Sequence, residues 1–503
     1  MKGKKTKRLF SVVLALVLMA GMILPGCQKK NTAVAGSAAG PKRVTLKYYW
    51  RAPQIPSDLQ TVNNAVNKIL EKSINADIQL VCIANTDYLQ KLNTMINSQE
   101  NFDLCFTSSG QGYVTQAQKG AFVDMTKLLP EYAPKTYALY KPSVWDAAKV
   151  NGKIYGSINQ QQFARQAVFA FNKALLDKYP QFDYKKVKSY ADLTPYLEMI
   201  KAGEPADQTT ELSSGLGNTL GGNIWYSWGW EPIGTQGNMP GWVKYNDKSG
   251  KVFNQYTTDE MKQIFLTMAD WYQKGYIPKD ALTRTNWDNS QQPIATPDTY
   301  KPGGETETAT QFSWKEAVLQ PVGDPFIPSS GLTGTMTSVS ATSKNPERAV
   351  QYIEQINTNK ELYNLLCYGI EGTHYTKIDD THIEQADNTK YKPNMNWELG
   401  NTFNAYLTGS QPDNFNALAQ KINSSSPVSN FVGFVFDDSS VKTEEANVMA
   451  VVSPYIKNLG MGVYGSQTEA KITEFNNKLK DAGMDKIIAE EQKQLTEFLK
   501  NGK

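Results

Sequence analysis

The feature that most limits the fold is an alternation of strand and helix patterns near the N-terminal end. Short runs rich in β-forming residues lie at Val44–Trp50, Ala76–Ile83 and Phe102–Phe106. Between them stand two segments with apolar residues on one helical face, the first beginning at Ser57 and the second near Tyr88. This order of strand, helix, strand, helix and strand is typical of a parallel sheet covered by helices. We therefore expect an α/β fold.

A second α/β unit follows the first. A new strand pattern covers Ala167–Asn172, and Thr257–Glu260 has capping-box spacing ahead of an apolar helical stripe. Residues 286–334 are rich in proline, glycine and threonine, as expected of a segment that crosses between lobes. We predict two lobes with a hinge between them, the first made of residues 44–158 and 286–340, the second of residues 159–285 and 341–503.

The first thirty residues have the layout of a secretory signal. A basic patch precedes an apolar run, Leu9–Leu24, which leads into Leu24-Pro25-Gly26-Cys27 and resembles a bacterial lipobox. This pattern predicts a signal peptide over residues 1–26 and lipid attachment at Cys27. The alternative is an uncleaved anchor helix, but proline and glycine interrupt the run, which is short of the roughly 20 apolar residues that cross a bilayer. Residues 27–43 are small and polar, which predicts a flexible tether.

The charge of the chain excludes one class of partner. The net charge of +3 comes from the predicted signal, and the mature part carries about −2. No basic stripe remains that could attract nucleic acid. We predict an extracytoplasmic, lipid-anchored monomer on the cell membrane that binds no nucleic acid.

Cysteine and histidine are scarce. In the mature part beyond the predicted lipidation site, Cys82, Cys105 and Cys367 lie in apolar stretches, as buried small side chains do. A disulfide between Cys82 and Cys105 stays open, because spacing alone cannot establish it. With only two histidines, the chain cannot form a histidine-rich metal site. We expect neither a metal nor a cofactor.

Several segments resemble one family when they are taken in order. These are Gln118–Phe122, Leu128–Pro134, Gly152–Gly156, Asn345–Ala349, Tyr368–Tyr375, Gly433–Phe436 and Ala482–Lys486. Their order is similar to that of the extracellular solute-binding proteins of family 1, in the lipoprotein subgroup of Gram-positive bacteria that carries an extra C-terminal region. The Tyr368–Tyr375 stretch is the most specific of them. The resemblance covers nearly the whole mature chain.

This resemblance implies a two-lobed, class II periplasmic-binding-protein fold that closes around a sugar. It also implies that the protein docks on the transmembrane subunits of a sugar-type ABC permease and is not an enzyme. Residues 209–254 match the family least, so we expect the identity of the substrate to be encoded there.

The ten tryptophans are distributed unevenly. Flat aromatic rings stack on the apolar C–H face of a pyranose, and a dense group of them in a loop indicates at least one ring that lines a cleft. Large aromatic residues are nevertheless found more often in cores. We predict that Trp225, Trp228 and Trp230 contact the ligand. For Trp145, Trp271 and Trp397 we predict core packing.

Topology predicts a second part of the binding site. In parallel sheets, ligands bind beyond the carboxyl ends of the strands, beside helix N-termini. A turn of serine and glycine there could hold hydroxyl or carboxylate oxygens, although a plain turn explains it equally well. The arginine could pair with an acidic sugar or be a surface charge. The residues selected in this way are Trp50, Arg51, Ser108, Ser109, Gly110 and Tyr113.

Further candidates lie near the predicted hinge. Asn159 precedes the second lobe, and Arg284 and Trp287 lie near the return crossing. We predict that all three contact the ligand. His374, in the segment most specific to the family, is more typical of a hydrogen-bonded structural residue.

Two other functions stay open. A secreted glycoside hydrolase or lyase would also need an aromatic cleft, but no nucleophile elbow, zinc pair or phosphate-binding motif occurs in the chain. A peptide- or signal-binding protein of the same fold would rely on backbone pairing and an anchoring charge. We favour capture of a carbohydrate, most simply an oligosaccharide, by hinge closure and its delivery to an ABC importer.

Overall fold

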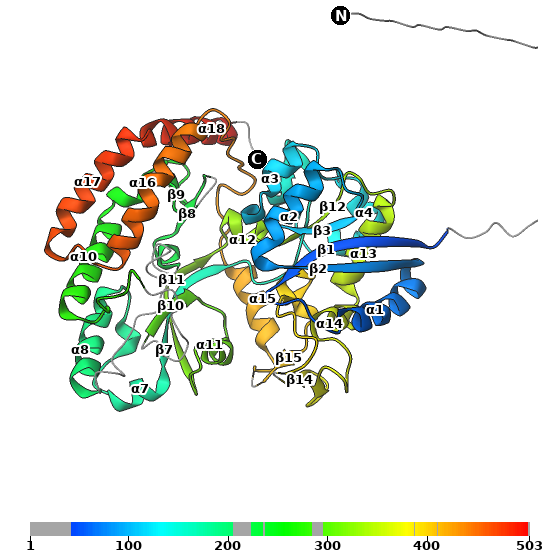
Figure 1. Ribbon diagram of the computed structural model, residues 1–503, viewed down its shortest axis with the longest axis horizontal. Helices are drawn as coiled ribbons and strands as arrows, with labels where there is room; N and C mark the ends of the chain where they lie inside the picture. Colours follow the sequence, from blue (N-terminus) through cyan, green and yellow to red (C-terminus); the bar gives the residue numbers. More distant parts are fainter. Residues whose placement is uncertain are drawn as a thin grey trace, which may run out of the picture. The chain divides into compact units, whose positions relative to one another are not determined.

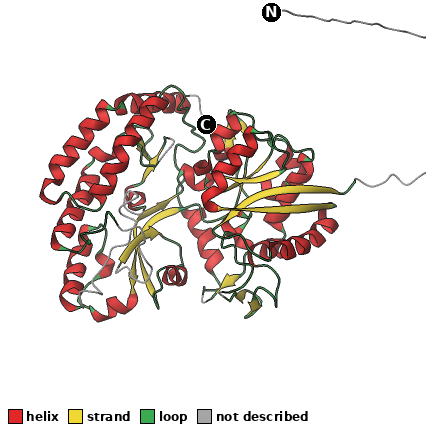
Figure 2. Cartoon of the chain, viewed as in Figure 1, coloured by secondary structure: helices red, strands yellow, loops and turns green. Residues whose placement is uncertain are grey.

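Two sheets, each with its own hydrophobic core, organise the chain (Figure 1). The computed structural model describes residues 42–204, 223–234, 237–283, 295–386, 388–409 and 411–500. Residues 43–503 form one compact unit. Helices flank both sheets (Figure 2). Within these ranges, no helix is both long and apolar enough to cross a bilayer.

The first sheet has five strands in the order β2-β1-β3-β12-β6. They are β1 (Val44–Ala52), β2 (Ala76–Ala84), β3 (Leu104–Thr107), β6 (Ser157–Ile158) and β12 (Met336–Val339). β1 pairs in parallel with β2 and β3, whereas β12 runs antiparallel between β3 and β6. The predicted parallel unit is confirmed, and one strand from much later in the chain completes it.

The helices of the first core form as their apolar spacing predicts. In α1 (Leu59–Ile74), Val62, Val66 and Leu70 are buried along one face. The helix ends at Asn75, whose left-handed φ of 50° lets the chain enter β2 at the next residue. The other helices of this core are α2 (Asn85–Asn97), α3 (Tyr113–Gln118), α4 (Leu128–Tyr132), α5 (Pro134–Tyr137), α6 (Pro142–Trp145), α13 (Pro346–Thr358) and α14 (Lys360–Tyr368).

The second sheet is smaller and antiparallel. Its order is β10-β7-β11, with β7 at Arg165–Asn172, β10 at Ala295–Thr299 and β11 at Ala317–Phe326. The helices α7 (Lys173–Lys178), α8 (Thr194–Gly203), α10 (Asp259–Lys274) and α11 (Glu305–Gln311) accompany it. The predicted helix is confirmed, but its N-cap is Thr258 and not Thr257, since the Thr258 hydroxyl accepts a hydrogen bond from the Met261 N–H at 3.3 Å.

The C-terminal helices pack on the second core. α16 (Lys442–Gly460) and α17 (Thr468–Asp481) contact α10, and α18 (Met484–Lys500) contacts α16. The turn after α16 needs glycine, because Gly462 has a φ of 67° and a Cβ there would lie 2.0 Å from the Met268 carbonyl oxygen. The C-terminal region is therefore built into the second lobe by close backbone contact.

Shorter elements complete the two lobes. The remaining strands are β4 (Lys149–Val150), β5 (Lys153–Ile154), β8 (Trp230–Pro232), β9 (Trp242–Lys244), β13 (Thr376–Lys377), β14 (His382–Glu384) and β15 (Leu407–Thr408). Within the described ranges the remaining α-helices are α12 (Ser329–Thr333) and α15 (Phe415–Ser425). Three 3-10 helices matter below, η1 (Ser109–Gln111), η5 (Ile224–Trp228) and η7 (Asn396–Glu398). Cys82, Cys105 and Cys367 are buried free thiols, so the first two form no disulfide.

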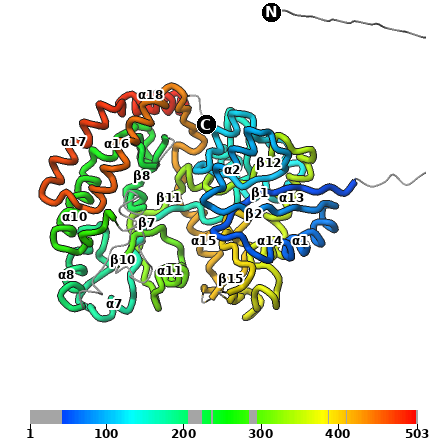
Figure 3. The backbone as a smooth tube through the Cα atoms, in the orientation of Figure 1, coloured from blue at the N-terminus to red at the C-terminus, as the bar shows by residue number. Residues whose placement is uncertain are grey.

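Three segments connect the two cores, and Figure 3 lets the reader follow the chain through them. We call residues 159–165, 326–330 and 426–430 the first, second and third crossings. The first is held by Asn423, whose side-chain oxygen accepts hydrogen bonds from the N–H groups of Phe163 and Ala164. The second and third pair directly through Ile327 and Val428. A hinge near Asn159 was predicted, whereas the predicted bounds placed the other two passages between lobes at residues 285/286 and 340/341, each earlier in the chain than the second and third crossings.

The lobe boundaries differ from the predicted ones in two places. β10 and β11 pair with β7, so most of residues 295–326 belong to the second sheet, although they were assigned to the first lobe. α13 and α14 pack in the first core, although they were assigned to the second lobe. The reason is β12, which inserts into the first sheet and brings the helices after it to the same core. Local periodicity identifies a strand but not the sheet it joins.

Candidate functional site

Arg51 and Glu398 form an ion pair at the carboxyl end of β1. The Arg51 Nε–H donates to Glu398 Oε1 at 2.5 Å, and the Arg51 backbone N–H donates to Oε2 at 3.4 Å. The glutamate is fully buried and the arginine is half-buried. Burial raises the pKa of Glu398 to about 8, and the neighbouring guanidinium opposes that rise only in part. The Nε side of the Arg51 guanidinium is therefore engaged by Glu398 and cannot bind an acidic sugar.

Trp397 lies beside this pair and is only half-buried. The Arg51 guanidinium carbon lies 5.3 Å from the centre of the Trp397 ring. Phe106 meets the same ring edge-to-face at 5.8 Å. A ring held on two sides with part of its surface open can serve as a stacking platform. The predicted core role of Trp397 is thus only partly right. Its place at the sheet edge could not be predicted, because the sequence around it has neither helical nor strand periodicity.

The structure places Trp50 in the core instead of the site. Only 1% of its surface is exposed, and it packs with Leu46 and Tyr48 in the first core. Arg51 points away from that face because successive side chains of a strand alternate. β1 is an interior strand with helices over the sheet, so its even-numbered positions from Leu46 to Ala52 are fully buried.

The turn after β3 is mainly structural. The Ser108 hydroxyl accepts a hydrogen bond from the Gln111 N–H at 3.1 Å and thereby caps η1. Tyr113 is fully buried and donates its hydroxyl proton to the Ala148 carbonyl oxygen at 2.5 Å. Only Ser109 and Gly110 are exposed. They stay candidates for ligand contact, whereas Ser108 and Tyr113 hold the turn and the helix after it.

Asn159 ties the first crossing to the sheet edge. It is fully buried, donates from Nδ2 to the Glu398 carbonyl oxygen at 2.8 Å, and accepts from the Thr337 hydroxyl at 3.2 Å. It therefore supports the segment that carries Trp397 and Glu398 and has no surface left for a ligand.

The aromatic segment at η5 lies against the second sheet. η5 contacts β7, which follows the first crossing, and β11, which precedes the second crossing. A Cβ at Gly323 on β11 would lie 2.5 Å from the Ser227 Cα, so only glycine allows this close approach. Trp225 and Trp228 are half-buried.

Trp230 and Trp242 belong to the second core instead. Trp230 is 2% exposed and Trp242 is 1% exposed. Each supports a half-buried ring, since Trp230 lies 4.7 Å from Trp228 and Trp242 lies 5.4 Å from Trp225, centre to centre. The prediction that Trp230 contacts the ligand was wrong, because its ring points inward from β8 into the second core.

Three further predicted residues, Arg284, Trp287 and Cys27, lie outside the described residues.

The matches with known proteins agree with this arrangement. Residues 64–369 match the family described as bacterial extracellular solute-binding protein, and residues 430–500 match a domain of unknown function (DUF3502). The family match covers more than half of the chain. The chain is a bacterial extracellular solute-binding protein. The family predicted from the order of its motifs is confirmed, and it is a family of binding proteins, not of enzymes.

Two relatives of this solute-binding protein share most of its length. A carbohydrate ABC transporter substrate-binding protein of Streptococcus pneumoniae is 29% identical over 505 residues, with 99% of each chain covered. A polygalacturonan/rhamnogalacturonan-binding protein of Bacillus subtilis is 22% identical over 386 residues and covers 73% of this chain and 74% of its own.

A solved structure gives the fold. The N-glycan transport solute-binding protein of Streptococcus pneumoniae superposes with a TM-score of 0.81 at 27% identity, covering 91% of this chain and 100% of that chain. Its complexes with Man1GlcNAc and Man5GlcNAc superpose at 0.73 and 0.70. The predicted two-lobed, class II solute-binding fold is confirmed.

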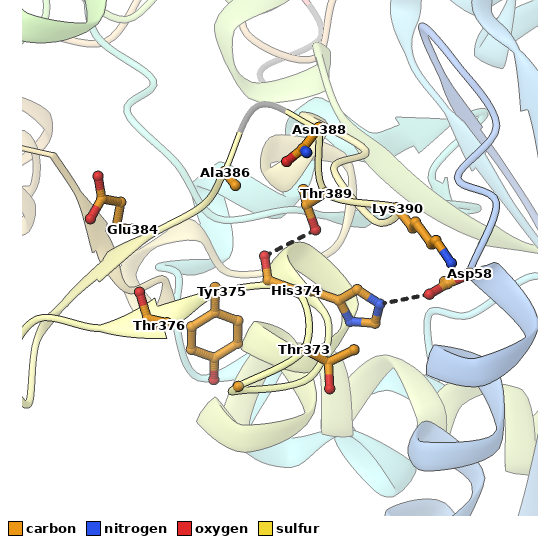
Figure 4. Close-up of a pocket in the computed structure, with 11 residues that line it drawn as sticks. Asp58, Thr373, His374, Tyr375, Thr376, Glu384, Ala386, Asn388, Thr389 and Lys390 are labelled. Atoms are coloured by element: carbon orange, nitrogen blue, oxygen red, sulfur yellow. Dashed lines mark hydrogen bonds and ion pairs between the residues drawn. The ribbon is translucent and has the colours of Figure 1, made fainter.

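A separate pocket of about 540 Å³ opens beside α1 and β13 in this solute-binding protein (Figure 4). His374 is buried at its inner end, accepts a hydrogen bond from the Ile370 N–H at 2.9 Å, and lies 3.3 Å from the Asp58 carboxylate. Thr389 donates to the His374 carbonyl oxygen at 3.1 Å. The structural role predicted for His374 is confirmed. No group of three metal-binding side chains occurs within the described residues.

Proposed function

We propose that this protein captures an oligosaccharide outside the cell and delivers it to the transmembrane subunits of an ABC importer. The observation that carries the proposal is the similarity, over 99% of both chains, to a carbohydrate ABC transporter substrate-binding protein. The N-glycan transport protein, solved with two mannose-containing glycans, supports the same ligand class.

The site chemistry suits a sugar. Three rings are half-buried: Trp397 beside the first sheet, and Trp225 and Trp228 in η5, which contacts the second sheet. The C–H face of a pyranose stacks on such rings, and the hydroxyl edge needs polar groups. The free N–H groups of Arg51 and the exposed Ser109 hydroxyl supply hydrogen-bonding partners on the first lobe.

Hinge closure provides the mechanism. A ligand that touches rings on both lobes binds the closed state more tightly than the open one and shifts the population by that difference in affinity. The crossings are the segments about which the lobes rotate. The importer then recognises the closed form.

Ligand screening tests the proposal. The melting temperature of the purified protein should rise with Man5GlcNAc or with another oligosaccharide, since a ligand that binds only the folded state stabilises it. Polygalacturonan fragments test an acidic sugar and short peptides test the alternative ligand class. A rise with peptides alone would contradict the sugar proposal, and release of shorter sugars during incubation would indicate a hydrolase.

We also propose that the chain is lipid-anchored at Cys27 and works as a monomer. The support is the basic and apolar N-terminal pattern that ends in Gly26-Cys27. Cells fed a labelled fatty acid should label the parent protein but not Cys27→Ser. Sedimentation of the soluble Cys27→Ser protein at one chain per particle checks the monomer, and a larger particle would contradict it.

A further inference from the structure

Glu231 is a buried carboxylate that the ligand site does not use. It lies on β8 directly after Trp230, and only 1% of its surface is exposed. Its Oε2 accepts a hydrogen bond from the Ser329 N–H at 2.8 Å, and its Oε1 accepts one from the Ser429 hydroxyl. Both carboxylate oxygens are thus engaged, and both donors are neutral groups.

The two donors stand on different crossings. Ser329 belongs to the second crossing and Ser429 to the third, and these crossings already pair through Ile327 and Val428. The Ile327 N–H donates to the Pro427 carbonyl oxygen at 2.8 Å, and the Ser429 N–H donates to the Ile327 carbonyl oxygen at 2.9 Å. One side chain of the second lobe therefore holds two of the three crossings together.

The strand that carries Glu231 is continuous with the aromatic segment. Only Gly229 and Trp230 separate it from Trp228. The Gly229 carbonyl oxygen accepts from the Tyr245 N–H at 2.9 Å, and the Tyr245 carbonyl oxygen accepts from the Asn430 N–H at 2.9 Å. A second chain of hydrogen bonds thus links the third crossing to the residue beside Trp228.

We propose that Glu231 is a positioning residue that fixes the second and third crossings against β8 and so sets the lobe orientation in which the aromatic segment meets the ligand. This inference rests on the proposed binding function. Contacts of this kind act at the hinge, where a small change in backbone angle becomes a large displacement of a lobe.

The surroundings of Glu231 make it sensitive to pH. Burial raises its pKa to about 7, and the hydrogen bonds from Ser429 and Ser329 oppose the rise. From η5, the phenol of Tyr226 faces Glu231 and also Arg165. Lys244 on β9 is exposed, and residues 326–331 and 426–432 contain no charged side chain. Protonation of Glu231 removes one acceptor, so the strength of this contact changes near neutral pH.

Distance measurements between the lobes test the inference. Labels are placed at Lys91→Cys on α2 and Lys480→Cys on α17, both exposed positions, in the full chain with Cys27→Ser. In the ligand-free protein, Glu231→Ala should widen the distance distribution about twofold, and it should raise the Kd for the oligosaccharide found by screening about tenfold, because the binding-competent orientation becomes a smaller fraction. Glu231→Gln, which can still accept from Ser329 and donate to Ser429, should change the Kd less than about threefold.

Controls separate this role from simple destabilisation. Glu491→Gln alters another buried glutamate, which lies against the hairpin at Gly234 and Gly241; its carboxylate oxygens accept no hydrogen bond from the described residues, so this change should leave the distances unchanged. Ser429→Ala removes the hydrogen bond from the Ser429 hydroxyl to Glu231, and its distances are measured instead if Glu231→Ala does not fold. The parent distribution should differ between pH 5.5 and 8.5, whereas that of Glu231→Gln should not.

The result that overturns the inference is a parent-like distance distribution in folded Glu231→Ala or, if that variant does not fold, in Ser429→Ala. Failure of the proposed function has a different signature, in which no oligosaccharide binds the parent. The ligand-free distances still test Glu231 in that case, since they need no ligand.

Discussion

Two buried glutamates, Glu398 at the edge of the first sheet and Glu231 at the crossings, differ in their partners. Glu398 faces the Arg51 guanidinium, whereas Glu231 receives only a backbone N–H and a serine hydroxyl. Burial nevertheless raises both pKa values, to about 8 for Glu398 and to about 7 for Glu231. The loss of water therefore disfavours the ionised form at both sites, and only at Glu398 does a neighbouring cation oppose it.

The largest expected effect is from Arg51→Ala. At pH 9 this change removes the cation beside a largely ionised, buried Glu398, which must then stay charged without a partner or take up a proton; this cost should lower the free energy of unfolding by about 3–5 kcal/mol. At pH 5 the loss should be smaller, since Glu398 then carries a proton in both proteins. Urea unfolding at the two pH values checks this. An equal loss at pH 5 and pH 9 would mean that packing of the arginine, not its charge, is what matters.

The second prediction concerns the pH dependence of stability. The folded pKa of Glu231, about 7, lies above the ordinary value of 4.5, so the folded state binds more protons between these values. Stability should therefore be higher at pH 4.5 and fall as the pH rises to 7, by about 3 kcal/mol for this group. The measurement is the difference in unfolding free energy between the parent and Glu231→Gln at each pH. A flat difference would show that Glu231 titrates normally.

The third prediction tests whether Glu231 stabilises the fold through its charge or through its hydrogen bonds. Glu231→Ala leaves the Ser329 N–H and the Ser429 hydroxyl buried without their acceptor, which should cost about 2 kcal/mol of stability. Glu231→Gln should cost less than half of that because it keeps both contacts. Thermal unfolding at pH 7 compares them. Equal losses in the two variants would assign the effect to charge alone.

The smallest effects concern the rings beside each glutamate. Trp397→Ala near Glu398 and Trp228→Ala near Glu231 should each weaken oligosaccharide binding by about 1–2 kcal/mol, as loss of an aromatic stacking contact does. Titration calorimetry measures this. Trp230→Ala provides the contrast, because removal of a core ring should mainly lower stability. If Trp397→Ala binds the oligosaccharide as tightly as the parent does, only the rings of the second lobe would remain as stacking platforms for the sugar.

The first sheet could be predicted from sequence because its elements follow one another. Val62, Val66 and Leu70 show their helical spacing without reference to any distant residue, and β1 to β3 alternate with α1 and α2. The position of β12 could not be predicted in this way, since nothing local says that it pairs with β3. The lobe boundaries were misplaced for this reason.

The candidate site was only partly predictable. The rule that ligands bind beyond strand ends pointed to the edge where Arg51, Ser109 and Trp397 lie, and binding of the ligand at this edge stays a proposal. It could not say that Trp50 faces inward while Arg51 faces the edge. Glu231 and Glu398 were missed, because nothing in the residues beside them in the sequence shows that their carboxylates are buried.

The sequence by itself determined the family, the α/β pattern and the tryptophan-rich segment, since each depends on residues close together in the chain or on the order of short motifs. The tertiary structure decided which rings are open, which sheet each returning strand joins, and which carboxyls are buried. Those properties depend on contacts between residues a hundred or more positions apart, such as Glu231 with Ser429 and Arg51 with Glu398. Only folding brings them within hydrogen-bond distance.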